Sequence, residues 1–237
     1  MSDTQNVIET IVQQGILPLY YNADVTDSLE ILRALYKAGI KAVEYTSRGD
    51  AALKNFTKMV EIRNVEMPSL LLGIGTIKNL QQAKDFIFVG ADFLVSPGFV
   101  KEVAEFALSV DIFYIPGCMT PSEIITSENA GLKFIKIFPG NILGPEYLNS
   151  IKAIFPKLFF MPTGGVNLTK KNIEEWLNAG VCAVGIGSKL ISKELMEQKK
   201  YETLESNTRE VLALIKQLRT EINSDKKLAY KSFSIKS

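Results

Sequence analysis

The chain has 237 residues, of which 46% are hydrophobic and 22% are charged, so it fits one globular domain with a sizeable core. Its 27 Lys and Arg residues balance 26 Asp and Glu residues, and the net charge of +1 provides no bulk field that would attract nucleic acid or an anionic membrane. The sequence contains no histidine, which excludes Ser-His-Asp and Cys-His catalysis and every metal site built on imidazole.

The cysteines and the N-terminus predict the cellular compartment. Cys118 and Cys182 are far apart and form no C-x-x-C pair, as is usual for proteins of a reducing compartment. The N-terminus is polar with helical spacing, and no apolar stretch approaches the roughly 20 residues that cross a bilayer. We therefore expect a cytoplasmic protein that binds neither a membrane nor nucleic acid.

Short apolar runs alternate with longer amphipathic segments from residue 15 onward, at intervals of roughly 20 to 27 residues. Continuous apolar strands favour parallel pairing, and parallel strands with helices on their outer side close into a (β/α)8 barrel. The sequence therefore predicts an α/β fold, a single TIM barrel over residues 1–222, with a doubly wound open sheet as the alternative. The predicted strands span residues 16–21, 42–47, 69–74, 93–96, 112–115, 134–138, 158–162 and 183–187.

Helix ends are marked at several joints between these runs. Glycine is expected to end four helices, and a hydroxyl or amide side chain to begin three. We expect an extra N-terminal helix over residues 2–13 at the bottom of the barrel and a last helix over 211–222. The Lys/Ser-rich residues 223–237 are expected to form a flexible tail. The predicted caps are Gly39, Gly90, Gly131 and Gly180 at C-termini, and Asn79, Thr120 and Thr169 at N-termini.

A lysine interrupts the apolar run at residues 134–138. Active sites of (β/α)8 barrels lie at the C-terminal ends of the strands, so a polar residue here is informative. Strand periodicity places Lys136 on one face and Ile135 and Ile137 on the other. A lysine that points into the barrel would have a lowered pKa and could act as an amine nucleophile. An exposed lysine, or one paired with a carboxylate, is the alternative.

Charged and hydroxyl side chains end two further strands. Glu44, Thr46 and Arg48 share one parity, so a regular strand would carry a proton carrier and an anion clamp on one face. An internal ion pair between Glu44 and Arg48 is the alternative. Thr76 ends the run G-I-G-T, and we expect its hydroxyl to bind a small carboxylate, although ordinary turn chemistry also accounts for this run.

Glycine-rich loops follow the last two predicted strands. Barrels frequently bind phosphate there, through backbone N–H groups and a helix N-terminus. Glycine permits close backbone approach, and a serine adds a hydroxyl donor. The run G-I-G-S lacks the third glycine of a dinucleotide fingerprint, so its position carries the argument. The predicted phosphate ligands are Gly164, Gly165, Gly187 and Ser188.

Six motifs in order resemble one known family, the class I KDPG/KHG aldolases, over roughly residues 7–220. Members of this family cleave 2-dehydro-3-deoxy-6-phosphogluconate (KDPG) or 4-hydroxy-2-oxoglutarate (KHG). The motifs are V-E-Y-T-S-R at 43–48, G-I-G-T at 73–76, S-P-G at 96–98, I-P-G-C-M-T-P-S-E at 115–123, I-K-I-F-P at 135–139 and P-T-G-G at 162–165.

The resemblance implies roles for the candidate residues. Lys136 matches the Schiff-base lysine, Glu44 the general acid/base, and Arg48 and Thr76 the site of the pyruvoyl carboxylate. The glycine loops and Ser188 match the phosphate site. The resemblance also implies a homotrimer with neither metal nor cofactor. The chain departs from the family at one motif. Family members often have P-A-E after the lysine motif, whereas residues 139–141 of this chain read P-G-N. This departure bears on substrate preference.

The expected function is a metal-independent aldolase acting on a small 2-oxo acid phosphate. The amine of Lys136 would attack the 2-oxo carbon, and Glu44 would carry protons until C3–C4 cleavage yields pyruvate and glyceraldehyde 3-phosphate. KHG or 2-dehydro-3-deoxy-6-phosphogalactonate is the alternative substrate. Two other classes stay open: a non-catalytic phosphosugar-binding barrel, and an isomerase or lyase that works through carboxylates alone.

Overall fold

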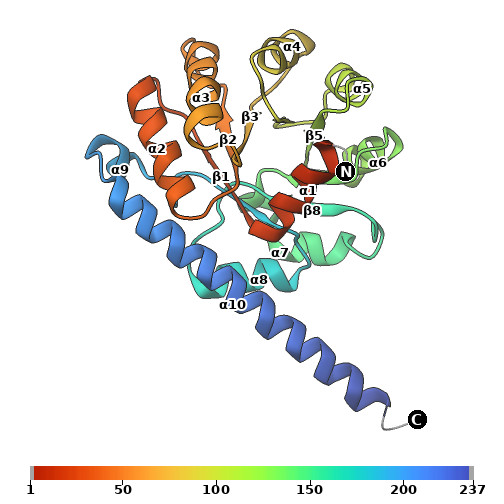
Figure 1. The fold of residues 1–237 in the computed structure, drawn as a ribbon. Helices are drawn as coiled ribbons and strands as arrows, with labels where there is room; N and C mark the ends of the chain where they lie inside the picture. Colours follow the sequence, from red (N-terminus) through yellow and green to blue (C-terminus); the bar gives the residue numbers. More distant parts are fainter. Residues whose placement is uncertain (1–2, 235–237) are drawn as a thin grey trace.

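The computed structural model describes the backbone of residues 3–234 and the side chains of residues 4–224. Parallel strands alternate with helices, and the helices surround the strands (Figure 1). The apolar runs form these strands within one or two residues of the predicted bounds. The strands are β1 (Ile16–Tyr20), β2 (Ala42–Thr46), β3 (Leu71–Gly75), β4 (Phe93–Val95), β5 (Phe113–Ile115), β6 (Gly117–Cys118), β7 (Phe134–Ile137), β8 (Phe159–Pro162) and β9 (Val184–Ile186).

The predicted helix caps are confirmed. Gly39, Gly90, Gly131 and Gly180 all have positive φ, between 85° and 106°. The side chains of Asn79, Thr120 and Thr169 each accept a backbone N–H in the first turn of their helix. The helices are α1 (Asp3–Gln14), α2 (Val25–Lys37), α3 (Ala52–Glu66), α4 (Leu80–Phe88), α5 (Lys101–Ser109), α6 (Pro121–Asn129), α7 (Gly140–Ile151), α8 (Lys170–Asn178), α9 (Lys193–Glu197) and α10 (Tyr201–Ser234).

The strands form a curved parallel sheet in two hydrogen-bonded parts. The larger part has the order β5-β4-β3-β2-β1-β9, and the smaller has the order β6-β7-β8. The predicted strand at 112–115 continues beyond its expected end and divides at Pro116, which has no N–H to donate. On the other side, a single parallel bridge between Thr163 and Gly185 joins the two parts. The fold is therefore α/β, with one curved sheet in place of a continuous eight-stranded ladder.

Two apolar clusters lie on opposite faces of the strands. Ile135 and Ile137 belong to the larger cluster, which the strands form with the surrounding helices. Phe134 and Met161 belong to a smaller inner cluster, in which strand side chains pack together with Val7 and Ile11 of α1. This division confirms the predicted parity of β7, so Lys136 lies on the inner face with Phe134.

The last helix is longer than the sequence predicted. α10 starts at Tyr201, not at residue 211, and continues through the predicted tail to Ser234. No glycine or proline follows Gly187, so nothing in the sequence of this segment breaks the helix. Residues 235–237 of the predicted tail lie outside the described part of the chain. Among the described residues, no helix combines the length and apolar character of a membrane span.

Candidate active site

A lysine and a glutamate meet inside the curved sheet. Lys136 comes from the middle of β7 and Glu44 from the middle of β2, strands that belong to different hydrogen-bonded parts of the sheet. The Nζ of Lys136 lies 3.8 Å from Oε1 of Glu44, so the contact spans the interior. Both residues are buried, with 5% and 1% of their surface exposed. The structure therefore brings together the two predicted catalytic residues, and Glu44 takes Lys136 as its ion-pair partner instead of Arg48.

Burial shifts the pKa of both groups toward the neutral form. Desolvation raises the pKa of Glu44, and the positive charges of Lys136 and Arg48 oppose this shift only in part. Desolvation also lowers the pKa of Lys136; the Glu44 carboxylate opposes this shift, and the charge of Arg48 reinforces it. Both shifts favour a neutral amine beside a carboxyl group that can hold a proton, which is the arrangement that an amine nucleophile needs.

The neighbouring strand leaves room for the glutamate. Gly75, the last residue of β3, pairs with Thr46 of β2. A Cβ atom at Gly75 would lie 1.8 Å from Oε1 of Glu44, so every larger residue would displace the carboxylate. Neither carboxylate oxygen of Glu44 has a hydrogen-bond partner among the described residues. A buried carboxylate without hydrogen bonds is costly, and such groups are typical of reactive sites.

Arg48 and Thr76 follow β2 and β3 at their C-terminal ends. β2 ends at Thr46, and the N–H of Arg48 donates to the carbonyl of Thr46 at 3.0 Å, so a turn carries the exposed arginine out of the strand. The strand therefore does not stay regular as far as Arg48, so this residue does not continue the face of Glu44 and Thr46. Thr76 is half-buried with a φ of 66°, a conformation that strains a β-branched residue. Strain of this kind concentrates at functional sites.

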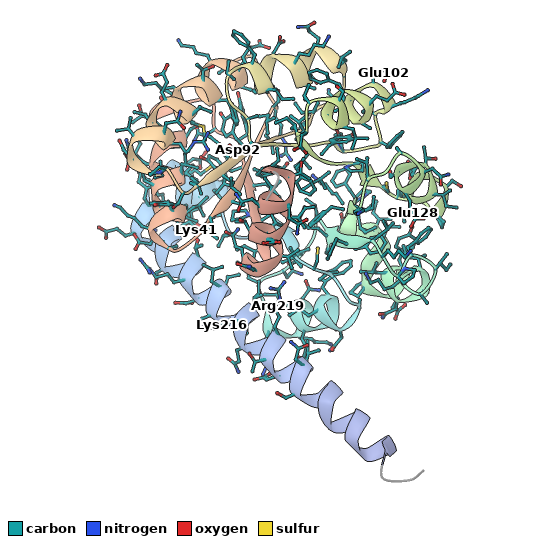
Figure 2. All side chains as sticks on the ribbon, turned by 45° about the vertical axis from the view of Figure 1, so that its right-hand side comes forward. Lys41, Asp92, Glu102, Glu128, Lys216 and Arg219 are labelled. Atoms are coloured by element: carbon teal, nitrogen blue, oxygen red, sulfur yellow. The ribbon has the colours of Figure 1, made fainter. Side chains whose placement is uncertain are left out.

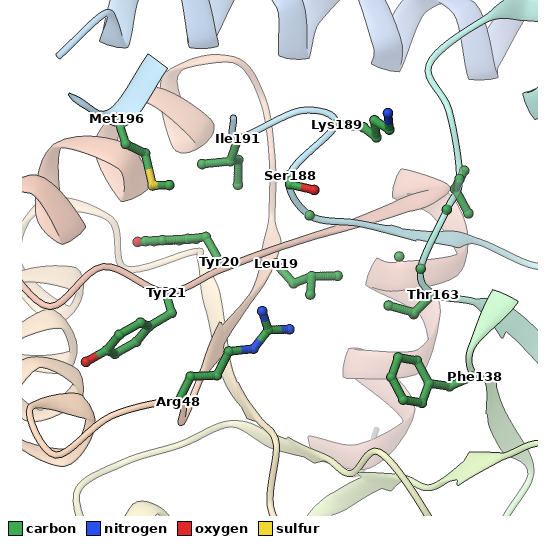
Figure 3. A pocket seen from close by; sticks show the side chains of 15 residues that line it. Leu19, Tyr20, Tyr21, Arg48, Phe138, Thr163, Ser188, Lys189, Ile191 and Met196 are labelled. Carbon is green, nitrogen blue, oxygen red and sulfur yellow. The ribbon is translucent and has the colours of Figure 1, made fainter. Parts of the chain in front are cut away.

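A pocket of about 300 Å³ opens at this end of the strands (Figure 3). All four predicted phosphate ligands line it: Gly164, Gly165, Gly187 and Ser188. Arg48 lines it as well, whereas Lys136, Glu44 and Thr76 do not. Phe138 connects the two groups, because its ring lines the pocket and its centroid lies 5.4 Å from the Nζ of Lys136. The pocket thus begins beside the buried lysine and ends at the glycine loops.

Comparison with known proteins assigns the family. The model of the family described as KDPG and KHG aldolase matches residues 7–206. The chain belongs to this family. It is 30% identical over 216 residues to a 2-dehydro-3-deoxy-phosphogluconate aldolase of Dickeya dadantii, an alignment that covers 90% of this chain and 98% of the relative. It is 28% identical to a KHG/KDPG aldolase of Escherichia coli, covering 90% and 98% of the two chains.

Solved structures of the aldolase family share the fold. A KDPG aldolase of Legionella pneumophila, with pyruvate captured as a covalent carbinolamine intermediate, superimposes with a TM-score of 0.79 at 29% identity. The match covers 86% of this chain and 97% of that one. A KDPG aldolase of Zymomonas mobilis matches with a TM-score of 0.75 at 26% identity, covering 87% and 97% of the two chains.

Three further residues of the site were not singled out from the sequence. Thr163 lines the pocket, and its buried hydroxyl has no hydrogen-bond partner among the described residues. Lys189 and Phe138 also line the pocket (Figure 3). Thr163 and Lys189 each adjoin a predicted phosphate ligand, so their proximity to Gly164 and Ser188 in the sequence was the available signal.

Residues 139–141, which read P-G-N where the family often has P-A-E, pack against the glycine loop after β8. The N–H of Gly140 donates to the carbonyl of Thr163 at 2.8 Å, and a Cβ at Gly140 would lie 2.9 Å from the carbonyl oxygen of Gly164. Asn141 packs against Gly165, where an added Cβ would lie 2.2 Å from the Cβ of Asn141. The start of α7 is therefore fitted closely to the glycine loop after β8.

In the described part of the chain, no three His, Cys, Asp or Glu residues are grouped to hold a metal ion.

Proposed function

We propose that the protein is a metal-independent Schiff-base aldolase that cleaves KDPG to pyruvate and glyceraldehyde 3-phosphate. The observation that carries this proposal is the contact of 3.8 Å between two buried groups, Lys136 and Glu44, whose pKa shifts both favour the neutral form. Membership of the aldolase family and the pyruvate carbinolamine in the Legionella pneumophila enzyme support the same chemistry. We infer that Lys136 is the nucleophile and Glu44 the proton carrier.

The reaction begins with attack of the neutral Lys136 amine on the 2-oxo carbon. Glu44 donates the proton that turns the carbinolamine oxygen into water, which leaves an iminium ion beside a carboxylate. The iminium accepts the electrons of the C3–C4 bond as the C4 hydroxyl gives its proton to the Glu44 carboxylate, so an enamine and an aldehyde form. Glu44 then helps to return a proton to C3, and water releases pyruvate. The iminium supplies the electron sink, so this route requires no metal ion.

The pocket suits the two ends of the substrate. Arg48 and Thr76 follow adjacent strands beside Glu44, and we assign the substrate carboxylate to them. We assign the distal phosphate to the backbone of Gly164, Gly165 and Gly187 and to the hydroxyl of Ser188, which line the far part of the pocket. Lys189 adds a positive charge there.

The remaining parts of the proposal concern the whole molecule. We propose that the bridge between Thr163 and Gly185 closes the strands into a (β/α)8 barrel, and that residues 1–222 form this catalytic unit, beyond which α10 continues to Ser234. We also propose a homotrimer, as the family resemblance implies, and a cytoplasmic location, as the cysteines and the N-terminus suggest. Light scattering of the purified protein would measure the oligomeric state.

Trapping the imine tests the proposed chemistry. Borohydride reduction in the presence of pyruvate should add one pyruvate-derived group to the protein, and peptide mapping should locate it on Lys136. Omitting pyruvate is the control, and Lys152→Met provides a second lysine variant that should still be labelled. If borohydride and pyruvate inactivate the enzyme and Lys136 is found unmodified, the mechanism is contradicted.

A second substrate is favoured by particular relatives. The Escherichia coli relatives include a KHG/KDPG aldolase and a 2-dehydro-3-deoxy-6-phosphogalactonate aldolase, so the same chemistry serves other 2-oxo acids in the family. A panel of such acids, assayed through coupled reduction of the released pyruvate, would rank them by kcat/KM. Ser188→Ala should lower the preference for phosphorylated over unphosphorylated acids by roughly tenfold, since a hydrogen bond to a charged group is lost. An unchanged preference would favour KHG as the substrate.

A further inference from the structure

A second cavity, of about 560 Å³, lies at the opposite end of the strands from the active-site pocket. α10 forms one wall, and α1 with the segments before β2 and β3 forms the other. Lys41 directly precedes β2, and Ser69 lies shortly before β3. The cavity shares no lining residue with the pocket, and the length of the strands separates the two. We call it the basal cavity and define it by Lys41, Lys216 and Arg219.

The basal cavity is strongly and locally positive. Lys41, Lys216 and Arg219 line it, and none of the described residues that line it is Asp or Glu. Figure 2 labels the three cations, Lys41 beside the barrel and the other two on α10. The whole chain has a net charge of only +1, so three unopposed cations in one cavity are a feature of this place and not of the surface at large.

Two of the three cations are held in place by the fold. The guanidinium of Arg219 donates to the carbonyl of Val12 at 2.7 Å and also to the carbonyl of Cys182. Neither bond neutralises its charge, because carbonyls are uncharged acceptors. The Nζ of Lys41 lies 4.8 Å from the ring centroid of Tyr36. Cations ordered before a ligand arrives lose less entropy on binding it.

The third cation is free to meet a ligand. Lys216 is exposed on α10, and within the described residues no carboxylate pairs with it or with Lys41. Gln13, Ser69 and Asn223 add amide and hydroxyl donors to the same cavity. The lining therefore combines positive charge with neutral hydrogen-bond donors, which is the chemistry that recognises a phosphate group.

We propose that the basal cavity binds a small phosphorylated metabolite, with Lys41, Lys216 and Arg219 neutralising its phosphate. Its volume falls within the range of about 300 to 1,000 Å³ that is usual for small-molecule sites. The α10 residues that line the cavity lie beyond residue 206, where the match to the aldolase family model ends, whereas Lys41 and the rest of the other wall lie within the match.

Chemical protection of lysines tests the proposal on the unmodified protein. The full-length enzyme is treated with an amine-acetylating reagent, with and without inorganic pyrophosphate, and acetylation is measured by peptide mass spectrometry. At ten times the dissociation constant, about a tenth of the sites stay free, so acetylation of Lys41 and Lys216 should slow about tenfold. Lys54, exposed on α3, is the internal control and should be unaffected. Equal labelling of all three lysines with and without pyrophosphate would overturn the proposal.

Paired variants give an independent measurement by calorimetry. Lys41→Gln with Lys216→Gln should weaken pyrophosphate binding at the basal cavity at least roughly tenfold, because two charge-assisted contacts are lost. The matched control, Lys54→Gln with Lys157→Gln, removes the same charge from exposed positions outside both cavities and should bind as the wild type does. Aldolase turnover should be unchanged in both double variants, since neither touches the pocket.

Competing anions distinguish the sources of the negative charge. Pyrophosphate should bind more tightly than orthophosphate, and succinate more weakly than either, if phosphate is the recognised group. A glutamate-rich peptide that displaces pyrophosphate at lower concentration than orthophosphate does would identify the cavity as a protein-docking site and overturn the assignment of a small metabolite.

Discussion

The two ends of the strands differ in whether a polar side chain has hydrogen-bond partners. At the N-terminal end, the side chain of Gln14 bonds four backbone groups, those of Ile16, Lys41 and Ala42, and every polar atom of this amide has a partner. At the C-terminal end, both carboxylate oxygens of Glu44 lack a hydrogen-bond partner among the described residues. The first end gains stability from its polar groups, whereas the second keeps a buried carboxylate available at a cost in stability.

Two lysines sharpen this contrast, because burial lowers the pKa of both. Lys152 donates to the carbonyl of Leu158 at 2.7 Å, at the start of β8, so its ammonium is satisfied. Among the described residues, the Nζ of Lys136 contacts the ring of Phe138 and the carboxylate of Glu44 and has no backbone partner. A lowered lysine pKa is therefore not in itself a sign of catalysis; the decisive difference is whether the nitrogen already has a backbone partner.

The largest expected effect is on the reactive lysine. Lys136→Met should lower kcat/KM for KDPG by at least about 10⁴-fold, because the nucleophile is lost. Lys152→Met should keep turnover within about twofold and instead lower the free energy of unfolding by about 1 kcal/mol, the usual value of one hydrogen bond. Steady-state kinetics and urea unfolding of both variants would measure this. A comparable loss of turnover in the Lys136→Met and Lys152→Met variants would contradict the proposed difference between the two lysines.

Removal of the carboxylate should have a smaller effect on rate. Glu44→Gln should lower kcat by about 10³-fold, within the range for loss of a general acid/base. Burial raises the pKa of Glu44 above its ordinary 4.5, so the folded protein binds this proton more tightly than the unfolded chain does. The contribution of Glu44 to stability is then fully present below pH 4.5 and declines as pH rises through the raised folded pKa.

The pH dependence of unfolding checks this sign. Glu44→Gln has no titrating group at this position, so its Tm at pH 8 should equal or exceed that of the wild type. The difference should shrink as pH approaches 4.5. A variant that is less stable than the wild type at pH 8 and equally stable at pH 4.5 would show that the carboxylate is ionised and paired at rest.

A single methyl group at the end of β3 should act on the same carboxylate. Gly75→Ala would place a Cβ against Oε1 of Glu44, and the forced displacement should lower kcat/KM by about 10²-fold, as expected for a misplaced catalytic group. Gly98→Ala is the matched control, because no heavy atom lies within 4 Å of its added Cβ. Equal activity of both variants with the wild type would mean that Glu44 has room to move and still function.

The smallest effect on activity is expected at the N-terminal end. Gln14→Ala removes four hydrogen bonds that link the start of β1 to the start of β2. It should lower the free energy of unfolding by about 2 to 4 kcal/mol and change kcat/KM by less than about twofold. Denaturant unfolding and steady-state assays would separate the two quantities. A large loss of turnover would show that β2 transmits changes at its start to Glu44.

Local patterns in the sequence predict the strands, the caps and the two residues that we propose to be catalytic. Lys136 and Glu44 each interrupt an apolar run at a parity that the inner face requires, so each is visible in its own segment. Contacts between segments that lie far apart in the sequence were harder to predict. The turn that carries Arg48 out of β2, and the division of a strand at Pro116, depend on how neighbouring strands pair. The long α10 went unrecognised because its sequence lacks a marked end, not because it lacks helix-forming residues.

The contact between Lys136 and Glu44 has a consequence for heat measurements. An amine beside a carboxylic acid carries the same number of protons as an ammonium beside a carboxylate. When pyruvate condenses with this pair, the products are an iminium ion, a carboxylate and one molecule of water, so the protons balance within the site. The calorimetric enthalpy of pyruvate binding should therefore be the same in PIPES and in Tris buffer, although these two buffers have very different heats of ionisation.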